Sequence, residues 1–280
     1  MSHPSLASTT PTTSPPPSLS LHFILGPPCA GKSTLAAHVT ATKPSLTHIS
    51  VGALLRALAS RGENAAQTSS EDDDYVTGLI PDTVDCDPSY VISGALPTST
   101  QNEASVSVDL PTVDTETFAQ IRDASAGNTL LDTGAMARVL HATLSHPALV
   151  SSASSILLDG FPRSVTQLPV FSERISHLWT PSRATVVLVL KVSRGEARRR
   201  FHGRAREGDE FEARFEAYEE SIGDIVDMFR GLGVTVVQVG EEENVGMREV
   251  VDAACRKLRE VEGWEDVGGG VAGGNVGGDE

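Results

Sequence analysis

The sequence predicts an α/β fold in which a parallel β-sheet is flanked by helices on both faces. Short apolar runs rich in β-branched residues recur along the chain, and such runs are typical of buried strands. Segments with helical patterns separate these runs, and this alternation is what the crossovers of a parallel sheet require. Hydrophobic residues make up 39% of the 280 positions, which is enough for a sizeable core.

The expected elements follow one another from residue 21. A strand at 21–25 runs through a Gly/Pro turn into a helix at 34–40. The remaining elements, in chain order, are helices at 52–60, 115–126 and 134–144, strands at 155–158 and 185–192, helices at 196–200 and 210–229, a strand at 234–239 and a helix at 244–261.

We expect a single domain at residues 21–262, with one segment before it, one after it and an insertion within it. Residues 1–20, dominated by Ser, Thr and Pro, are predicted to be a disordered leader. Residues 62–113 carry ten acidic residues and no Lys or Arg, so we interpret them as an acidic insertion that contributes little to the core. Residues 263–280 are predicted to be a flexible Gly-rich tail.

The amino-acid composition argues against several classes of binding partner. With 22 Lys+Arg against 37 Asp+Glu, the net charge of -15 argues against non-specific binding to nucleic acid or to anionic membranes. Cys29, Cys86 and Cys255 are widely spaced and form no CxxC or CxxH pattern, which favours a reducing compartment. No apolar run approaches the ~20 residues that cross a bilayer, and the first twenty residues hold no Lys or Arg. We expect a cytoplasmic monomer whose partners are small molecules.

One motif predicts nucleotide binding. Residues 26–33, GPPCAGKS, match G-x-x-x-x-G-K-[ST] and lie between the first strand and the first helix. In such a P-loop, backbone N–H groups and the helix N-terminus surround phosphates, and Lys32 reaches the β- and γ-oxygens of ATP. Ser33 or Thr34 would place a hydroxyl near Mg²⁺, and Asp159 would contact the metal through water. The expected ATP-binding residues are Gly26, Cys29, Ala30, Gly31, Lys32, Ser33 and Thr34.

A second motif indicates the class of acceptor. LLDGFPRSVTQ, residues 157–167, resembles the DGFPR-x-x-x-Q motif of the nucleoside monophosphate kinases, the family of adenylate kinase and UMP/CMP kinase. HISVGALLRA, residues 48–57, is similar to that family's I-S-T-G-D-x-L-R-A. The resemblance implies that Arg56 and Arg163 hold the acceptor phosphate, which suits the bidentate geometry of guanidinium groups. The monophosphate-binding residues that it implies are Val51, Arg56, Gly160, Arg163 and Gln167.

Residues 197–220 look like the family's short lid, at about 200–210, followed by its arginine-bearing helix. The resemblance implies that Arg200, Arg204, Arg206 and Arg214 stabilise the transferring phosphoryl group together with Lys32 and Arg163. Two alignments stay open: one places Arg204, and the other, which we favour, places Arg206 on the family's Gly-Arg pair. The alternative interpretation is a helix face on which arginines pair with Glu neighbours.

The reaction that the resemblance implies is transfer of the γ-phosphoryl group of Mg-ATP to a nucleoside monophosphate, with AMP preferred. Gln167 is expected to pair with adenine, although it could instead cap the turn after Pro162. Cys29 and Ser33 stand where the family usually has Gly, and Val51 and Ala53 replace its Thr and Asp. A UMP/CMP kinase, or a nucleotide-binding regulatory protein that has lost efficient transfer, are therefore the alternatives.

Overall fold

A computed structural model gives the structure of the chain. The predicted lid residues Arg204 and Arg206 lie outside the part of the chain that it describes, as do the predicted leader up to residue 18 and the tail from residue 268. The described residues are 19–43, 45–66, 92–93, 110–147, 149, 155–202, 211–240, 247–265 and 267.

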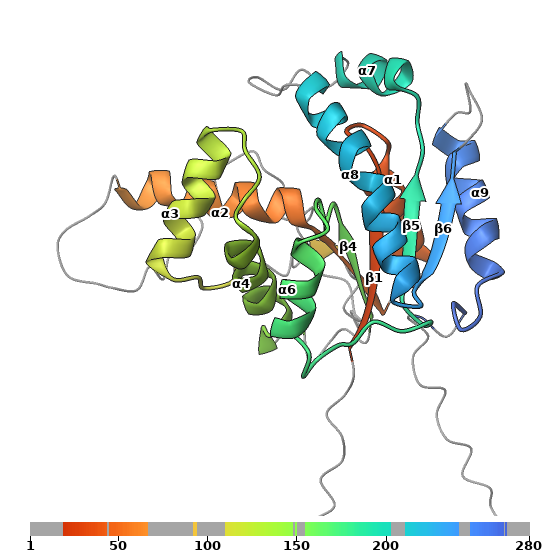
Figure 1. The fold of residues 1–280 in the computed structure, drawn as a ribbon, viewed down its shortest axis with the longest axis horizontal. Coiled ribbons are helices and arrows are strands. Elements are labelled where there is room, and N and C mark those ends of the chain that lie inside the picture. Colours follow the sequence, from red (N-terminus) through yellow and green to blue (C-terminus); the bar gives the residue numbers. More distant parts are fainter. Residues whose placement is uncertain are drawn as a thin grey trace, which may run out of the picture.

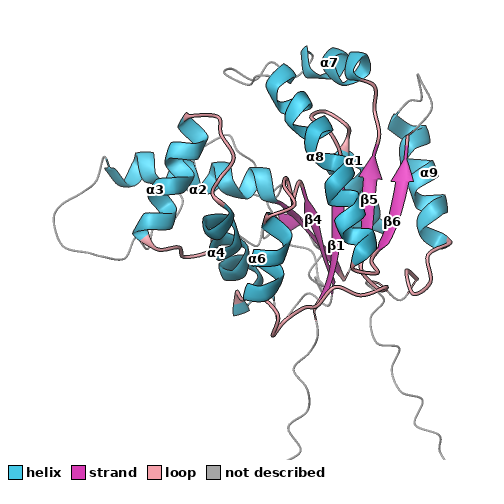
Figure 2. Cartoon of the chain, viewed as in Figure 1, coloured by secondary structure: helices cyan, strands magenta, loops and turns pink. Residues whose placement is uncertain are grey.

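A six-stranded sheet forms the middle layer of the molecule (Figures 1 and 2). Five strands run parallel, and the short β3 pairs antiparallel with β2 at one edge. The order β3-β2-β4-β1-β5-β6 places β1 between β4 and β5, and the predicted α/β fold is confirmed. The strands are β1 (Ser20–Leu25), β2 (Leu46–Ser50), β3 (Ile92–Ser93), β4 (Ser155–Asp159), β5 (Val186–Leu190) and β6 (Thr235–Val239).

Helices cover both faces of this sheet (Figure 1). Every helix that the sequence predicts is present, and α6 is an additional one that follows directly on the DGFPR segment. Within the described residues, none is long and apolar enough to cross a membrane. The helices are α1 (Lys32–Thr42), α2 (Val51–Ala66), α3 (Thr115–Ala126), α4 (Thr133–Leu144), α6 (Gln167–Arg174), α7 (Arg194–His202), α8 (Phe211–Gly231) and α9 (Met247–Arg259).

The strand pleat divides the core into two halves because successive side chains point to opposite faces. Phe23 lies on the face covered by α4, α6 and α8, where its ring packs against Trp179 at 5.7 Å and Phe229 at 5.1 Å between ring centroids. The neighbouring Ile24 lies on the other face, with Leu35 of α1 and Ala254 of α9. Burial on both faces explains why these strands read as continuous apolar runs.

The acidic insertion predicted at residues 62–113 needs correction where the structure describes it. Helix α2 continues to Ala66, and Ile92–Ser93 forms the edge strand β3. Leu110 is only 8% exposed and belongs to the core on the α4 and α8 face. The acidic composition of this segment gave no signal for these elements. The buried side chain of Leu110 nevertheless packs into the core.

The predicted domain ends also need correction. The backbone N–H of Leu19, inside the predicted leader, donates a hydrogen bond to the Leu178 carbonyl at 2.9 Å. At the other end, Trp264 and Val267 are buried, although they fall in the predicted Gly-rich tail. The folded chain therefore reaches beyond residues 21–262 at both ends.

We predict that Leu110→Ala lowers the free energy of unfolding by about 2–3 kcal/mol, because it removes a buried side chain and leaves a cavity. The matched control is Leu130→Ala, since Leu130 is 51% exposed and its loss should change the free energy by no more than about 0.5 kcal/mol. Urea titration followed by circular dichroism measures both. Equal effects from the two variants would mean that Leu110 does not belong to the core.

Candidate functional site

The GPPCAGKS loop turns at the carboxyl end of β1 and leads directly into α1. Gly31 precedes the helix with φ +91°, and no side chain caps the first turn of α1, so its backbone N–H groups are available to an anion. Cys29, where the family resemblance expects Gly, has φ +59° in the left-handed region that Gly adopts most easily. The Lys32 ammonium donates to the carbonyls of Gly26 at 2.8 Å and Pro27 at 2.9 Å.

Asp159 ends β4 beside this loop, because the register of the parallel pair sets it opposite Ile24 of β1. Its Oδ2 accepts a hydrogen bond from the Ser33 hydroxyl at 3.2 Å and lies 3.6 Å from Nε2 of His48. Burial alone would raise the pKa of Asp159, but the neighbouring His48 ring and the Lys32 charge bring it below its ordinary value. The structure thus presents a charged carboxylate at the first turn of α1.

His48 is a site residue for which the sequence analysis proposed no role. It comes from β2, is 4% exposed and lies under α1 against Asp159. The sequence did hold one indication of His48: it is a titratable residue in the same short segment, HISVGALLRA, as Arg56. Strand β2 itself was not predicted, because its sequence LTHIS mixes polar with apolar residues.

The ammonium of Lys32 lies among charged neighbours. Burial lowers its pKa from 10.5 to about 8, Asp159 acts to raise it, and Arg163 and Arg214 act to lower it. The structure therefore brings Lys32, Asp159, Arg163 and Arg214 close enough to influence one another, although α1, the DGFPR segment at the end of β4 and α8 are far apart in the sequence.

Two guanidinium groups converge above the start of α2. A Cβ atom added to Gly52 would lie 3.4 Å from Nη2 of Arg163 and 3.4 Å from Nη1 of Arg56. Burial lowers the pKa of Arg163, and so do the charges of Arg214 and Arg56. Asp159 acts on Arg163 in the opposite direction. Guanidinium groups gathered in this way are the kind of arrangement that could hold an anion such as a phosphate.

Gln167 positions Arg163 within the DGFPR turn. The Gln167 side chain is 2% exposed, and its Oε1 accepts a hydrogen bond from the Arg163 backbone N–H at 2.8 Å. The Arg163 Nε in turn donates to the carbonyl of Gly160, which has φ +79°. This contact is the turn cap that the sequence analysis named as the alternative role. A carbonyl oxygen has a second lone pair, so the cap and a ligand can share it.

The remaining predicted residues have different surroundings. Val51 is fully buried at the start of α2, next to Gly52. Arg200 donates to Glu196 at 2.7 Å, one turn earlier in α7, which is the helix-face pairing given as the alternative for this arginine.

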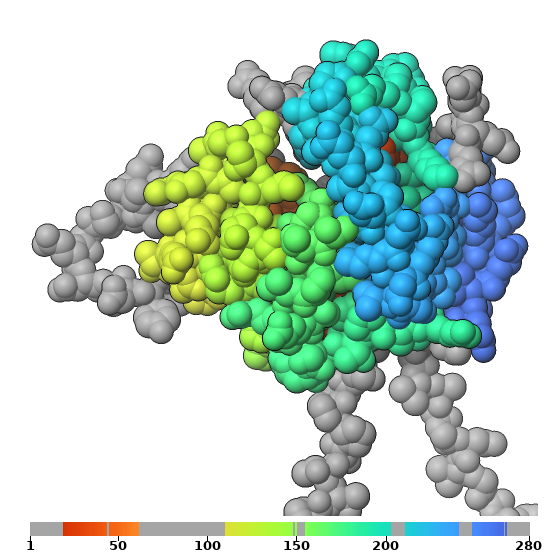
Figure 3. Space-filling view, viewed as in Figure 1, coloured from red at the N-terminus to blue at the C-terminus, as the bar shows by residue number. Residues whose placement is uncertain are grey.

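Figure 3 shows a hollow between the α3 and α4 region and the α7 and α8 region, with the red-to-brown early part of the chain visible inside it.

The residues expected to contact Mg²⁺ through water fit that role chemically. Ser33 and Asp159 supply a hydroxyl and a charged carboxylate, the hard oxygen donors that Mg²⁺ prefers, and the ion usually keeps several waters beside the phosphates. Among the described residues, no group of three or more His, Cys, Asp or Glu could hold a metal ion.

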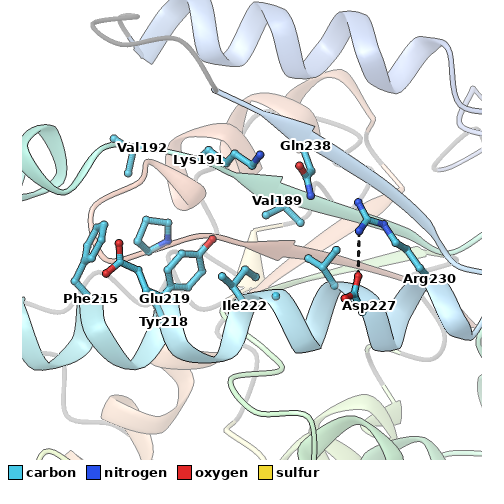
Figure 4. A pocket seen from close by; sticks show the side chains of 13 residues that line it. Val189, Lys191, Val192, Phe215, Tyr218, Glu219, Ile222, Asp227, Arg230 and Gln238 are labelled. Carbon is cyan, nitrogen blue, oxygen red and sulfur yellow. Dashed lines mark hydrogen bonds and ion pairs between the residues drawn. The ribbon is translucent and has the colours of Figure 1, made fainter.

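A separate groove of about 450 Å³ lies between α8 and strands β5 and β6 (Figure 4). Val189 of β5 and Ile222 of α8 line it from the two sides, and the Asp227–Arg230 ion pair lies at one end. It touches the phosphate-loop region through Pro27, but its lining includes neither Lys32 nor Arg163.

The sheet, the loop before α1 and the converging charges define an α/β protein compatible with a P-loop kinase. No family model matches the chain. The chain is similar to an adenylate kinase from Nautilia profundicola, with 32% identity over 112 residues. The match covers 39% of this chain and 56% of the relative, so it spans little more than half of that protein's length. It supports a distant relationship to nucleotide kinases.

We predict that the Lys32 amine titrates at about pH 8, below the range of an ordinary lysine. Asp159→Asn should lower this midpoint and Arg163→Gln should raise it, because the two charges act in opposite directions. Acetylation at a series of pH values, read by mass spectrometry, gives the midpoint, and the exposed Lys257 serves as the internal control. A Lys32 midpoint equal to that of Lys257 would contradict the electrostatic description.

Proposed function

We propose that this chain is a nucleoside monophosphate kinase that transfers the γ-phosphoryl group of Mg-ATP to AMP. The observation that carries the proposal is the convergence of Lys32, Arg56, Arg163 and Arg214 around the uncapped first turn of α1. The proposal includes a cytoplasmic monomer that binds neither nucleic acid nor membrane, with the catalytic domain at about residues 21–262 as amended above.

The donor would bind at the loop before α1. Lys32 would exchange its hydrogen bonds to the Gly26 and Pro27 carbonyls for the β- and γ-oxygens of ATP. The loop amides and the first turn of α1 would receive the remaining phosphate charge. Mg²⁺ bound with ATP would neutralise part of the phosphate charge, and Ser33 and Asp159 would hold its water shell.

The acceptor would bind over Gly52. A monophosphate carries close to two negative charges, and the guanidinium groups of Arg56 and Arg163 offer two bidentate donors from one side. The anion would relieve the mutual repulsion that lowers the pKa of Arg163. Gly52 contributes by having no side chain, since a Cβ atom there would lie 3.4 Å from both guanidinium groups.

Transfer would proceed directly between the two nucleotides, without a covalent enzyme intermediate. Positioning and charge stabilisation supply most of the catalysis in phosphoryl transfer. The charge of Arg214 acts on both Lys32 and Arg163, which supports a role for it in stabilising the charge that would develop between donor and acceptor. Arg200, with Arg204 or Arg206, would close over the group, and Arg200 would first have to leave Glu196.

We predict that Lys32→Ala lowers kcat by at least ~100-fold, the scale expected when one preorganised charge contact is removed. ADP release in a coupled assay with ATP and AMP measures it. Lys257→Ala is the matched control, because this exposed lysine of α9 binds the Gln238 carbonyl and should leave kcat unchanged. Near-native turnover by a folded Lys32→Ala protein would remove the basis of the kinase proposal.

The preference for AMP rests on Gln167. Its amide can present a donor and an acceptor to adenine N1 and N6, whereas uracil and guanine offer the opposite pattern. We predict that AMP exceeds UMP and GMP in kcat/KM by about 10-fold or more in the native chain. Cytosine has a similar edge, so CMP tests the UMP/CMP kinase alternative directly.

Gln167→Glu separates base recognition from the turn cap. Glu keeps an oxygen for the Arg163 N–H, so the turn should persist. It loses the NH₂ donor and adds a negative charge, and because that charge faces AMP and UMP alike, the loss of the donor should make the advantage of AMP over UMP collapse. A ratio that stays constant would reject the adenine assignment and favour a UMP/CMP kinase.

The pairing of Arg200 with Glu196 favours a second candidate, a regulatory protein that binds ATP through Lys32 and releases no ADP with AMP, CMP, UMP or GMP.

A further inference from the structure

A histidine that the proposed reaction does not use is buried in the centre of the sheet. His22 of β1 has no exposed surface and faces the half of the core that α1 and α9 cover. Its Nδ1 accepts a hydrogen bond from the backbone N–H of Val186 at 3.2 Å. The neutral ring therefore carries its proton on Nε2, and this atom has no hydrogen-bond partner within the described part of the chain.

A short segment after α9 covers this ring. We call residues 260–265 with Val267 the C-terminal strap. Trp264 of the strap is 4% exposed and meets the His22 ring edge to face, with ring centroids 5.4 Å apart and planes at 83°. Lys43, at the end of α1, lies over the same indole at 5.4 Å and donates to the Glu265 carbonyl at 3.3 Å.

We propose that the C-terminal strap is a pH-sensitive closure, held over the amino end of the sheet while His22 is neutral and released when His22 takes up a proton. Protonation places an N–H on Nδ1 facing the N–H of Val186, so a donor meets a donor and the hydrogen bond is lost. It also places a charge among apolar side chains, where a buried charge is costly unless it is paired. Release of the strap admits water to the ring.

The charged groups around His22 oppose protonation further. Within the described residues, the charge that acts on it is the Lys43 ammonium, which has the same sign. The Glu265 carboxylate lies 3.8 Å from the Lys43 ammonium and is mostly exposed to solvent. It therefore pairs with the lysine and not with the His22 ring. Trp264, which contacts the His22 ring from the strap, does not titrate.

The sign and size of the effect follow from linkage. Burial first, and then Lys43, lower the pKa of His22 from 6.5 to about 4 in the closed form. The closed form keeps its full stability above about pH 6.5, weakens as the pH falls toward 4, and changes no further below that. A difference of about 2.5 pKa units for one proton corresponds to a change of up to about 300-fold in the opening equilibrium.

Single-tryptophan fluorescence tests the proposal on the full chain. The sequence has two tryptophans, so Trp179→Phe leaves Trp264 as the reporter. Its emission and acrylamide quenching are followed from pH 8 to pH 4.5, with far-ultraviolet circular dichroism on the same samples. We expect Trp264 to become accessible below about pH 6.5, with the opening constant rising about 10-fold per pH unit, while the helical signal stays constant.

Two substitutions in that background identify the titrating group. His22→Phe keeps an aromatic ring against Trp264 and cannot take up a proton, so the pH response should disappear. His141→Phe is the matched control, because His141 is also partly buried with a lowered pKa, caused by burial, Arg174 and His177, and should leave the response intact. A response that survives His22→Phe overturns the proposal, and so does a Trp264 that stays shielded at pH 5.

A reciprocal measurement needs no change at His22. Because coupling acts in both directions, Trp264→Ala should raise the pKa of His22 toward 6.5, which a nuclear magnetic resonance titration of the histidine ring protons resolves. An unchanged pKa contradicts the proposal. Loss of the helical signal at the same midpoint as the Trp264 response also contradicts it, since the event would then be general acid unfolding. None of these readouts depends on kinase activity, so the kinase proposal and this one can fail separately.

Discussion

The parallel pairing of β1 with β4 sets Ile24 opposite Asp159, and the arrangement of the proposed site depends on that register. The two strands end at the same edge of the sheet, so the GPPCAGKS loop after β1 and the DGFPR segment that begins with Asp159 lie beside each other there. The backbone N–H of Gly160 donates to the Ile24 carbonyl at 3.1 Å and continues this pairing into the turn. A slip of one residue would turn Asp159 to the other face and separate it from Ser33.

The fold buries the cationic groups of Lys32 and Arg163 close to other positive charges, which disfavours their charged forms. The fall in the pKa of Lys32 from 10.5 to about 8 corresponds to roughly 3 kcal/mol of destabilisation of the ammonium. The Arg163 guanidinium is likewise disfavoured by burial and by its cationic neighbours. Asp159 offsets part of this cost for both groups. A phosphate anion would offset the rest, so the same electrostatics that weaken the folded chain would strengthen nucleotide binding.

Sequence reasoning located the elements that are regular and missed those that depend on tertiary contacts. Runs such as VVLVL of β5 are buried on both faces, and their composition alone identifies them. Strand β2 has polar residues in buried positions because His48 meets Asp159, a contact that no periodicity reveals. Helix α6 is short and carries Pro169 in its first turn, so it lacked a helical pattern. Leu110 and Trp264 are single apolar residues in segments of otherwise polar or Gly-rich composition.

The candidate site divides in the same way. Motifs identified Lys32, Arg163 and Asp159, because each belongs to a local pattern with a known chemistry. They left open whether Arg200 pairs within its own helix and whether Gln167 caps the Arg163 turn, since both contacts depend on rotamers and burial. Gly52 was also missed, because its closeness to Arg56 and Arg163 is a tertiary contact that the sequence does not show.

Helix α1 connects the two ends of the sheet that carry titratable groups. With 11 residues at 1.5 Å each it is about 16 Å long, with Lys32 at its first turn and Lys43 directly after its last. The surroundings of the two lysine side chains differ. Lys32 is held by carbonyls in a buried loop, where its pKa falls, while Lys43 lies against an indole and an exposed carboxylate. Contacts of the C-terminal strap therefore bear on the far end of the helix that presents the phosphate loop. Because α9 packs against α1 on the same face of the sheet, the strap and the loop before α1 lie on the same side of the sheet.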